Sequence, residues 1–127
     1  MINQKLILGT AQFGNSYGIT NYEKKRMKQK DILNILKICD SRILILDTAE
    51  NYNINNKIKK SFKNFTVNTK VDVKLFNKSK KFLFNFFSKI NKFYKIDTLF
   101  IRNIENNFQN QIIYKKIEYL KKFKIIK

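Results

Sequence analysis

The chain has 127 residues, 43% of them hydrophobic, which allows one compact domain with a core and argues against a disordered tail. Its 27 basic and 9 acidic residues give a formal net charge of +18, a balance that attracts polyanions such as nucleic acid. Of the basic residues, 24 are Lys and only 3 are Arg, the side chain best shaped for phosphate. Lys, Asn and Ile, the residues that A/T-rich codons favour, together make up 60 residues, so drift in composition explains the charge equally well.

The sequence also indicates where the protein works. No apolar run approaches the ~18 residues of a membrane-spanning helix, and the N-terminus has no signal-peptide pattern. Cys39 is the single cysteine, so no internal disulfide can form, and the chain has no His with which to build a usual zinc site. We therefore expect a cytoplasmic protein that makes no membrane contact.

Apolar runs alternate with helical patterns along the chain, and this order predicts a parallel sheet covered by helices. The predicted strands are residues 6–8, 43–46, 65–71 and 96–101. The first two runs are continuously apolar, so we expect both to be buried. The predicted helices, which carry apolar residues at helical spacing, are residues 30–40, 55–64, 79–94 and 113–122. The last residues, 125–127, have the pattern of the start of a fifth strand.

Polar residues stand where the predicted strands end. Asp47 and Tyr52 follow the second strand, Lys70 closes the third, and Arg102 follows the fourth. In an α/β barrel, one of the folds built from alternating strands and helices, residues at the carboxyl ends of the strands face the active site. Position alone therefore indicates a catalytic set, although Asp47 could simply cap its loop and Lys70 could stand there by chance.

Three of these stretches resemble the aldo-keto reductases, which are NADPH-dependent (β/α)8-barrel enzymes. The family's Asp-Thr-Ala-x-x-Tyr signature matches residues 47–52, and its strand ending in Thr-Lys matches 69–70. Its fourth-strand pattern, Ile-Asp-x-Leu-x-x-His-Asn, matches 96–103 except that Arg102 replaces His. The opening Leu-Gly-Thr-Ala-Gln-Phe-Gly, residues 8–14, is similar to members that act in polysaccharide and sugar biosynthesis.

The resemblance implies that residues 1–127 form a single truncated domain, the N-terminal half of the barrel with about four βα units. A complete barrel typically needs ~250 residues. The family's remaining contacts to nicotinamide and adenosine phosphate follow its later strands and lie outside these four units. The resemblance thus predicts ancestry more directly than activity.

The implied activity is reduction of an aldehyde or keto-sugar, with NADPH as the source of hydride. Tyr52 would donate the proton, Lys70 would stabilise the tyrosinate that forms, and Asp47 would hold Lys70 in place. The residues that the resemblance assigns to cofactor binding are Gly9, Thr10, Ala11 and Asp47.

Two positions depart from the family pattern. Arg102 keeps a hydrogen-bond donor but adds a permanent charge, so it could select an anionic substrate or mark lost activity. Asn53 stands where the family usually has Gly, directly after Tyr52, and Asn tolerates a left-handed backbone.

Three interpretations stay open at this point. The chain is an N-terminal portion of a reductase, either completed by a missing C-terminal half or left as a non-functional remnant. Alternatively, two copies form a closed barrel as a homodimer. In the third interpretation it is a cationic binding protein for nucleic acid or another polyanion, against which the scarcity of Arg speaks.

Overall fold

The computed structural model describes residues 6–19, 21–39, 45–105 and 107–126. Four strands lie within these ranges: β1 (Ile7–Gly9), β2 (Ile45–Ala49), β3 (Thr66–Asp72) and β4 (Ile96–Arg102). The α-helices are α1 (Ala11–Gly14), α2 (Gln29–Cys39), α3 (Asn56–Lys60), α4 (Lys80–Asn91) and α5 (Asn107–Lys122). Two short 3₁₀ helices, η1 (Ser61–Asn64) and η2 (Val73–Asn77), complete the described elements.

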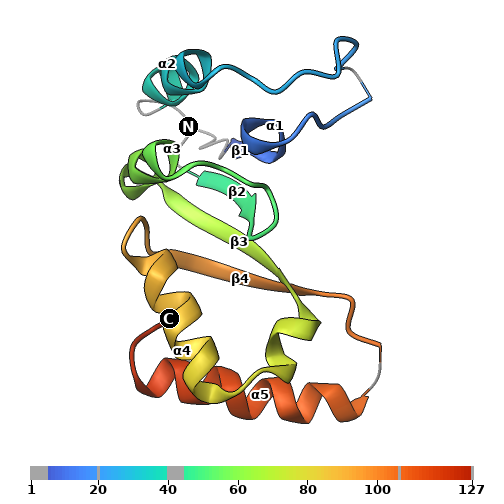
Figure 1. Ribbon diagram of the computed structural model, residues 1–127. Helices are drawn as coiled ribbons and strands as arrows, with labels where there is room; N and C mark the ends of the chain where they lie inside the picture. Colours follow the sequence, from blue (N-terminus) through green and yellow to red (C-terminus); the bar gives the residue numbers. More distant parts are fainter. Residues whose placement is uncertain (1–5, 20, 40–44, 106, 127) are drawn as a thin grey trace, which may run out of the picture.

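The described strands form one parallel sheet in the order β1-β2-β3-β4, so strand order follows chain order (Figure 1). Each pair of neighbouring strands is joined by a crossover that contains helix, as parallel pairing requires. This is the arrangement of four βα units of an α/β barrel, and the predicted fold class is confirmed. In Figure 1, α2 lies at one end of this row of strands and α5 at the other.

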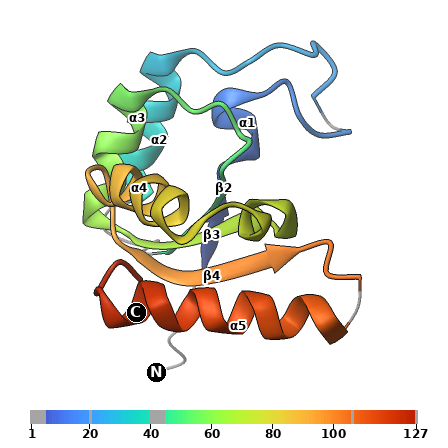
Figure 2. The ribbon, with the colours of Figure 1, turned by 60° about the horizontal axis from the view of Figure 1, so that its bottom comes forward.

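The core forms where the helices cover the sheet. Fully or almost fully buried residues on the strands include Leu46, Val67 and Val71. Burying side chains of this size stabilises the fold by ~1.5–3 kcal/mol each. The helical residues that meet them are Ile32, Leu36, Ile58, Phe62, Phe76, Leu83 and Phe87. α5 packs against α4 and η2, and its residues Ile113 and Leu120 are buried. Figure 2 shows α5 at the bottom and α2 and α3 at the top, with β4 drawn between them.

Side-chain caps fix where the helices begin. Asn55 accepts the Ile58 N–H at 3.0 Å and starts α3, and Ser79 accepts the Phe82 N–H at 3.2 Å and starts α4. Each bond satisfies one of the backbone donors that a helix N-terminus leaves unpaired. The predicted start of the third helix at Ser79 is therefore confirmed.

Several predicted boundaries were wrong. The first strand is not buried as predicted, and Leu6 and Ile7 are each 57% exposed. The reason is its place at the edge of the sheet, where β1 has only β2 as a neighbour among the described strands. β2 and β4 continue past their predicted ends, so Asp47 and Arg102 lie inside strands, where ladder hydrogen bonds extend the pairing. Ile125 and Ile126 form no strand in the described structure. Residues 40, 43, 44 and 127, which also belong to predicted elements, lie outside the described residues.

The predicted helix over 55–64 splits into α3 and η1, and the short helices α1 and η2 were not predicted. Ile58 and Phe62 are nevertheless both buried, as the helical spacing indicated. Within the described ranges, no helix combines the length and the apolar character needed to cross a membrane.

Candidate active site

Asp47 and Lys70 form an ion pair at the carboxyl side of the sheet. Lys70 Nζ contacts Asp47 Oδ2, and both side chains are 29% exposed. The register aligns Ala49 with Lys70, which sets Lys70 two residues further along than Asp47 and on the same face. The structure thus brings these two predicted site residues together. Because a partly exposed pair contributes only ~0–1 kcal/mol, its orientation of Lys70 matters more than its stability.

The end of β1 is joined to β2 through Thr10. Both the Thr10 N–H and its hydroxyl donate to the Asp47 carbonyl oxygen, at 2.9 and 3.0 Å, and Thr10 is fully buried. Its hydroxyl is therefore already engaged in holding the strands. A Cβ added at Gly9 would meet no atom within 4 Å, so a ligand has room to approach there. Ala11, half-buried, begins α1.

Tyr52 stands on a tight turn after β2. Its N–H donates to the Ala49 carbonyl at 3.3 Å, and Asn53 has φ 51°, the left-handed backbone that Asn tolerates. Gly14 lies directly against this turn, because a Cβ there would collide with the Tyr52 carbonyl. The ring of Tyr52 packs against the core. Among the described residues its hydroxyl makes no hydrogen bond, so its pairing with Lys70 stays a prediction.

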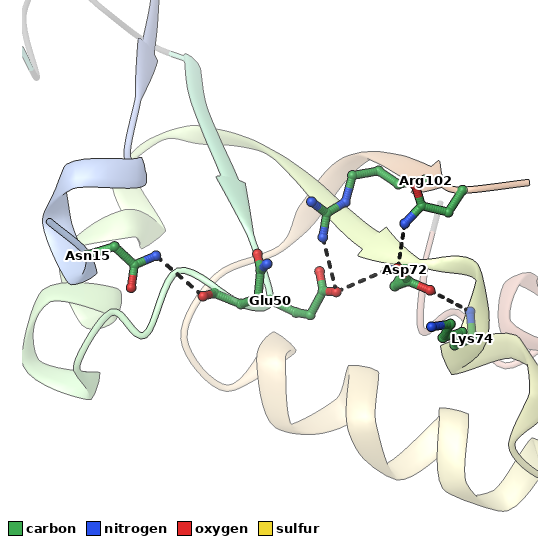
Figure 3. A network of polar contacts seen from close by, with 7 residues as sticks. Asn15, Glu50, Asp72, Lys74 and Arg102 are labelled. Carbon is green, nitrogen blue, oxygen red and sulfur yellow. Dashed lines mark hydrogen bonds and ion pairs between the residues drawn. The ribbon is translucent and has the colours of Figure 1, made fainter. Parts of the chain in front are cut away.

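Arg102, the last residue of β4, pairs with an acid that the sequence analysis did not select. Its Nη2 lies 3.5 Å from Glu50 Oε1, and that oxygen also accepts the Asp72 N–H at 3.0 Å (Figure 3). The side chains of Arg102 and Glu50 are 37% and 22% exposed. Glu50 Oε2 and Arg102 Nε are buried without a partner in the described structure.

Further contacts extend this network across the strand ends. The Asn103 amide donates to Asp72 Oδ2 at 2.7 Å, and the Lys74 N–H donates to Asp72 Oδ1 at 2.9 Å. The Lys74 bond first and the Asn103 bond second hold the Asp72 pKa below its ordinary value of 3.8, so the carboxylate is ionised.

On the other side of the network, the Asn15 amide donates to the Asn51 carbonyl at 3.5 Å (Figure 3). Asn53 in turn donates to Asn15 Oδ1 at 3.1 Å. Polar contacts thus connect the segments that follow all four described strands.

Glu50, Asp72 and Asn103 are the site residues that sequence reasoning missed. The available signal was Glu50 itself. It occupies a variable position of the Asp-Thr-Ala-x-x-Tyr pattern, in a chain that has Arg102 at the His position of the fourth-strand pattern. An acid near an unusual base is the kind of pair that a parallel sheet can bring together.

Two larger cavities lie away from these residues. One of about 490 Å³ is lined by Lys95, Lys121 and Lys124 near the start of β4. Another of about 540 Å³ lies beside Gln12 and the segment 21–27. Neither is lined by Asp47, Tyr52, Lys70 or Arg102. The described residues also contain no cluster of His, Cys, Asp or Glu suited to a metal ion.

No family model and no curated protein matches this chain. Its structure is similar to the crystal structure of PA4992, a proposed aldo-keto reductase of Pseudomonas aeruginosa, with a TM-score of 0.59 and 17% sequence identity. The match covers 94% of this chain and 52% of the other, so this chain spans about half the length of that solved structure. At this identity the similarity shows the fold: a partial α/β barrel of the aldo-keto reductase type.

Proposed function

We propose that this chain carries the proton-donating part of the active site of an NADPH-dependent carbonyl reductase. The Asp47–Lys70 ion pair is the observation that carries the proposal. The two residues are 23 positions apart, on different strands, and the pairing was expected from the family's chemistry. The aldo-keto-reductase-like fold supports it independently.

In this proposal Tyr52 donates a proton to the carbonyl oxygen of an aldehyde or keto-sugar. Lys70, held by Asp47, stabilises the tyrosinate, and Arg102 orients the carbonyl through a guanidinium N–H. NADPH, when bound, supplies the hydride. The open position at Gly9 and the half-buried Ala11 leave room for it beside Asp47.

Complete activity in this proposal requires further strands. β1 and β4 each have one neighbour in the described sheet, and the other edge of each is free to pair. The additional strands would come from a C-terminal half or from a second copy in a homodimer. A reducing compartment such as the cytoplasm suits Cys39, which is a buried free thiol.

Two measurements on one sample test the proposal. NADPH binding is followed by quenching of nucleotide fluorescence, and light scattering records the oligomeric state. We expect saturable binding that weakens at least tenfold in Asp47→Asn, because Asp47 is one of the residues assigned to the cofactor. Asp31→Asn serves as the control, because it makes the same change at an exposed position on α2. A folded chain that binds no NADPH, alone or as an oligomer, contradicts the proposal.

The role of Tyr52 is tested by reduction of an aldehyde. Tyr52→Phe should lower kcat by ~100-fold or more while NADPH binding persists, because only the proton donor is lost. Tyr114 is 63% exposed on α5, and Tyr114→Phe, which removes its hydroxyl, should leave kcat unchanged. Equal rates for the two variants would exclude Tyr52 as the acid.

A further inference from the structure

The charge of Arg102 is compensated inside the network of Figure 3. Glu50 Oε1 lies 3.5 Å from Arg102 Nη2, and the carboxylate is the less exposed partner, at 22%. Asp47 likewise balances Lys70. Each of the two bases is therefore paired with an acid, in a chain whose net charge is +18. Asp72, the third acid of the network, lies beside Lys74, and in addition to its hydrogen bonds the nearby charges of Lys74 and Arg102 both help to lower its pKa.

A closed ring of contacts determines where Glu50 lies. Its N–H donates to the Lys70 carbonyl at 3.1 Å, and its carboxylate accepts the Asp72 N–H at 3.0 Å, so backbone and side chain are both tied to β3. Asp72 accepts from Asn103 at 2.7 Å, and Asn103 adjoins Arg102 in the chain with a left-handed φ of 62°. The ring fixes the acid and the base relative to each other.

Compensation changes what a guanidinium can recognise. An unpaired Arg offers hydrogen-bond donors together with a full positive charge, which attracts carboxylates. A paired Arg keeps its remaining N–H donors and has lost most of that attraction. Arg102 uses Nη2 for Glu50, and its other terminal nitrogen has no partner within the described structure.

We propose that Glu50 is a positioning residue that also determines specificity. By holding Arg102 and cancelling its charge, it makes the pair a neutral donor, so that the site accepts an uncharged carbonyl compound and disfavours one that carries a carboxylate. This inference rests on the proposed reductase function and names its substrate class. A purely structural pair would affect stability and leave the preference for ligand charge unchanged.

Binding of benzoate and benzamide to the full chain, measured by ligand-observed NMR, tests the proposal. The two probes have similar shapes and differ in charge. Glu50→Gln exposes the charge of Arg102 and should tighten benzoate binding about tenfold, with benzamide changed by less than about twofold. The double variant Glu50→Gln, Arg102→Met should lose this gain, and the conservative Glu50→Asp should keep the wild-type preference.

Glu118→Gln is the matched control, since it makes the same change in net charge at an exposed position on α5. An equal benzoate gain in Glu118→Gln would show general surface attraction and overturn the proposal. No gain in Glu50→Gln, or a gain that survives removal of Arg102, would overturn it as well. If Glu50→Gln fails to fold, Arg102→Met leaves Glu50 uncompensated and should weaken benzoate binding about tenfold.

Enzyme assays separate this inference from the function on which it rests. Reduction of 4-carboxybenzaldehyde is compared with that of its uncharged amide, 4-carbamoylbenzaldehyde. In Glu50→Gln, we expect KM to fall for the acid alone, so that kcat/KM for the acid rises about tenfold relative to that for the amide. If both aldehydes are reduced and Glu50→Gln leaves the preference between them unchanged, the inference is rejected and the reductase function stands. No reduction of either aldehyde, with the benzoate gain still present, rejects the reductase function and leaves the charge compensation standing.

Discussion

Gly14 shapes the turn that carries Tyr52. It is buried at the end of α1, and a Cβ at this position would collide with backbone atoms of residues 52–54. Backbone atoms cannot swing away as the end of a flexible side chain can. The absence of a side chain at Gly14 therefore lets the β1 and β2 loops pack at the distance that the site requires.

Gly14→Ala should lower the free energy of unfolding by about 3 kcal/mol, because the added methyl group forces the two loops apart. Gly9→Ala is the matched control, since its Cβ would meet no atom within 4 Å, and it should change stability by less than ~1 kcal/mol. Urea unfolding followed by circular dichroism measures both. Similar values for the two variants would contradict the close approach at Gly14.

Tyr94 links stability to alkaline pH. It is 7% exposed, its ring centroid lies 5.6 Å from that of Phe62, and burial raises its pKa above the ordinary 10.0. Below pH 10.0 both folded and unfolded states keep the proton, and the contribution to stability is constant. Above pH 10.0 the unfolded state releases it first, so stability falls until the folded-state pKa is passed.

Tyr94→Phe should remove this component. The stability of the wild type relative to Tyr94→Phe should be constant below pH 10 and decline above it. If the stability curves of the two proteins stay parallel above pH 10, Tyr94 has the same pKa in the folded and unfolded states, which would contradict this prediction. Because the lysines of the chain titrate in both proteins, the difference between the two curves isolates the tyrosine.

At the level of elements, the N-terminal cap of α4 contributes to stability in a way that a single substitution can measure. Ser79 accepts the Phe82 N–H, and Ser79→Ala should cost ~1 kcal/mol of stability by leaving that donor without its partner. Ser88→Ala, a change inside the same helix, should be neutral or slightly stabilising because Ala is the better helix former. Thermal unfolding of both variants checks the contrast, and a larger loss at Ser88 would contradict the assignment of the cap.

The regular elements could be predicted because local patterns specify them. The run of residues 43–46 and the spacing of Ile32, Leu36 and Cys39 identify a strand and a helix without knowledge of their neighbours. α1 and η2 escaped prediction because each is about one turn long, and a local contact such as the Asp72 cap on Lys74 forms η2.

The candidate site was likewise predictable only in part. The Asp47–Lys70 pair follows from strand order and a family pattern, both readable in the sequence. The Glu50–Arg102 pair depends on the alignment of Asp72 with Arg102 and on where the β2 turn directs the Glu50 side chain. These are tertiary facts that no local pattern contains.

For the whole molecule, the net charge of +18 predicts weak binding to any polyanion. Affinity for duplex DNA should be independent of its sequence and fall steeply between about 0.05 and 0.2 M salt, because counterion release drives it. Lys70→Met and Lys63→Met should weaken it equally, since each removes one charge. Fluorescence anisotropy measures this, and sequence-selective binding that survives high salt would favour a nucleic-acid function instead.

The order of strands in the sheet is also the order in which a ribosome makes them. β2 and β3 can pair while β4 is still unmade, and Glu50 then has the Asp72 N–H but no countercharge. The cation arrives with residue 102, the last residue of β4. Because a carboxylate removed from water is costly until it is paired, we expect a nascent chain to keep this end of the sheet loose. Synthesis of β4 would then supply the countercharge and let the segment after β2 settle.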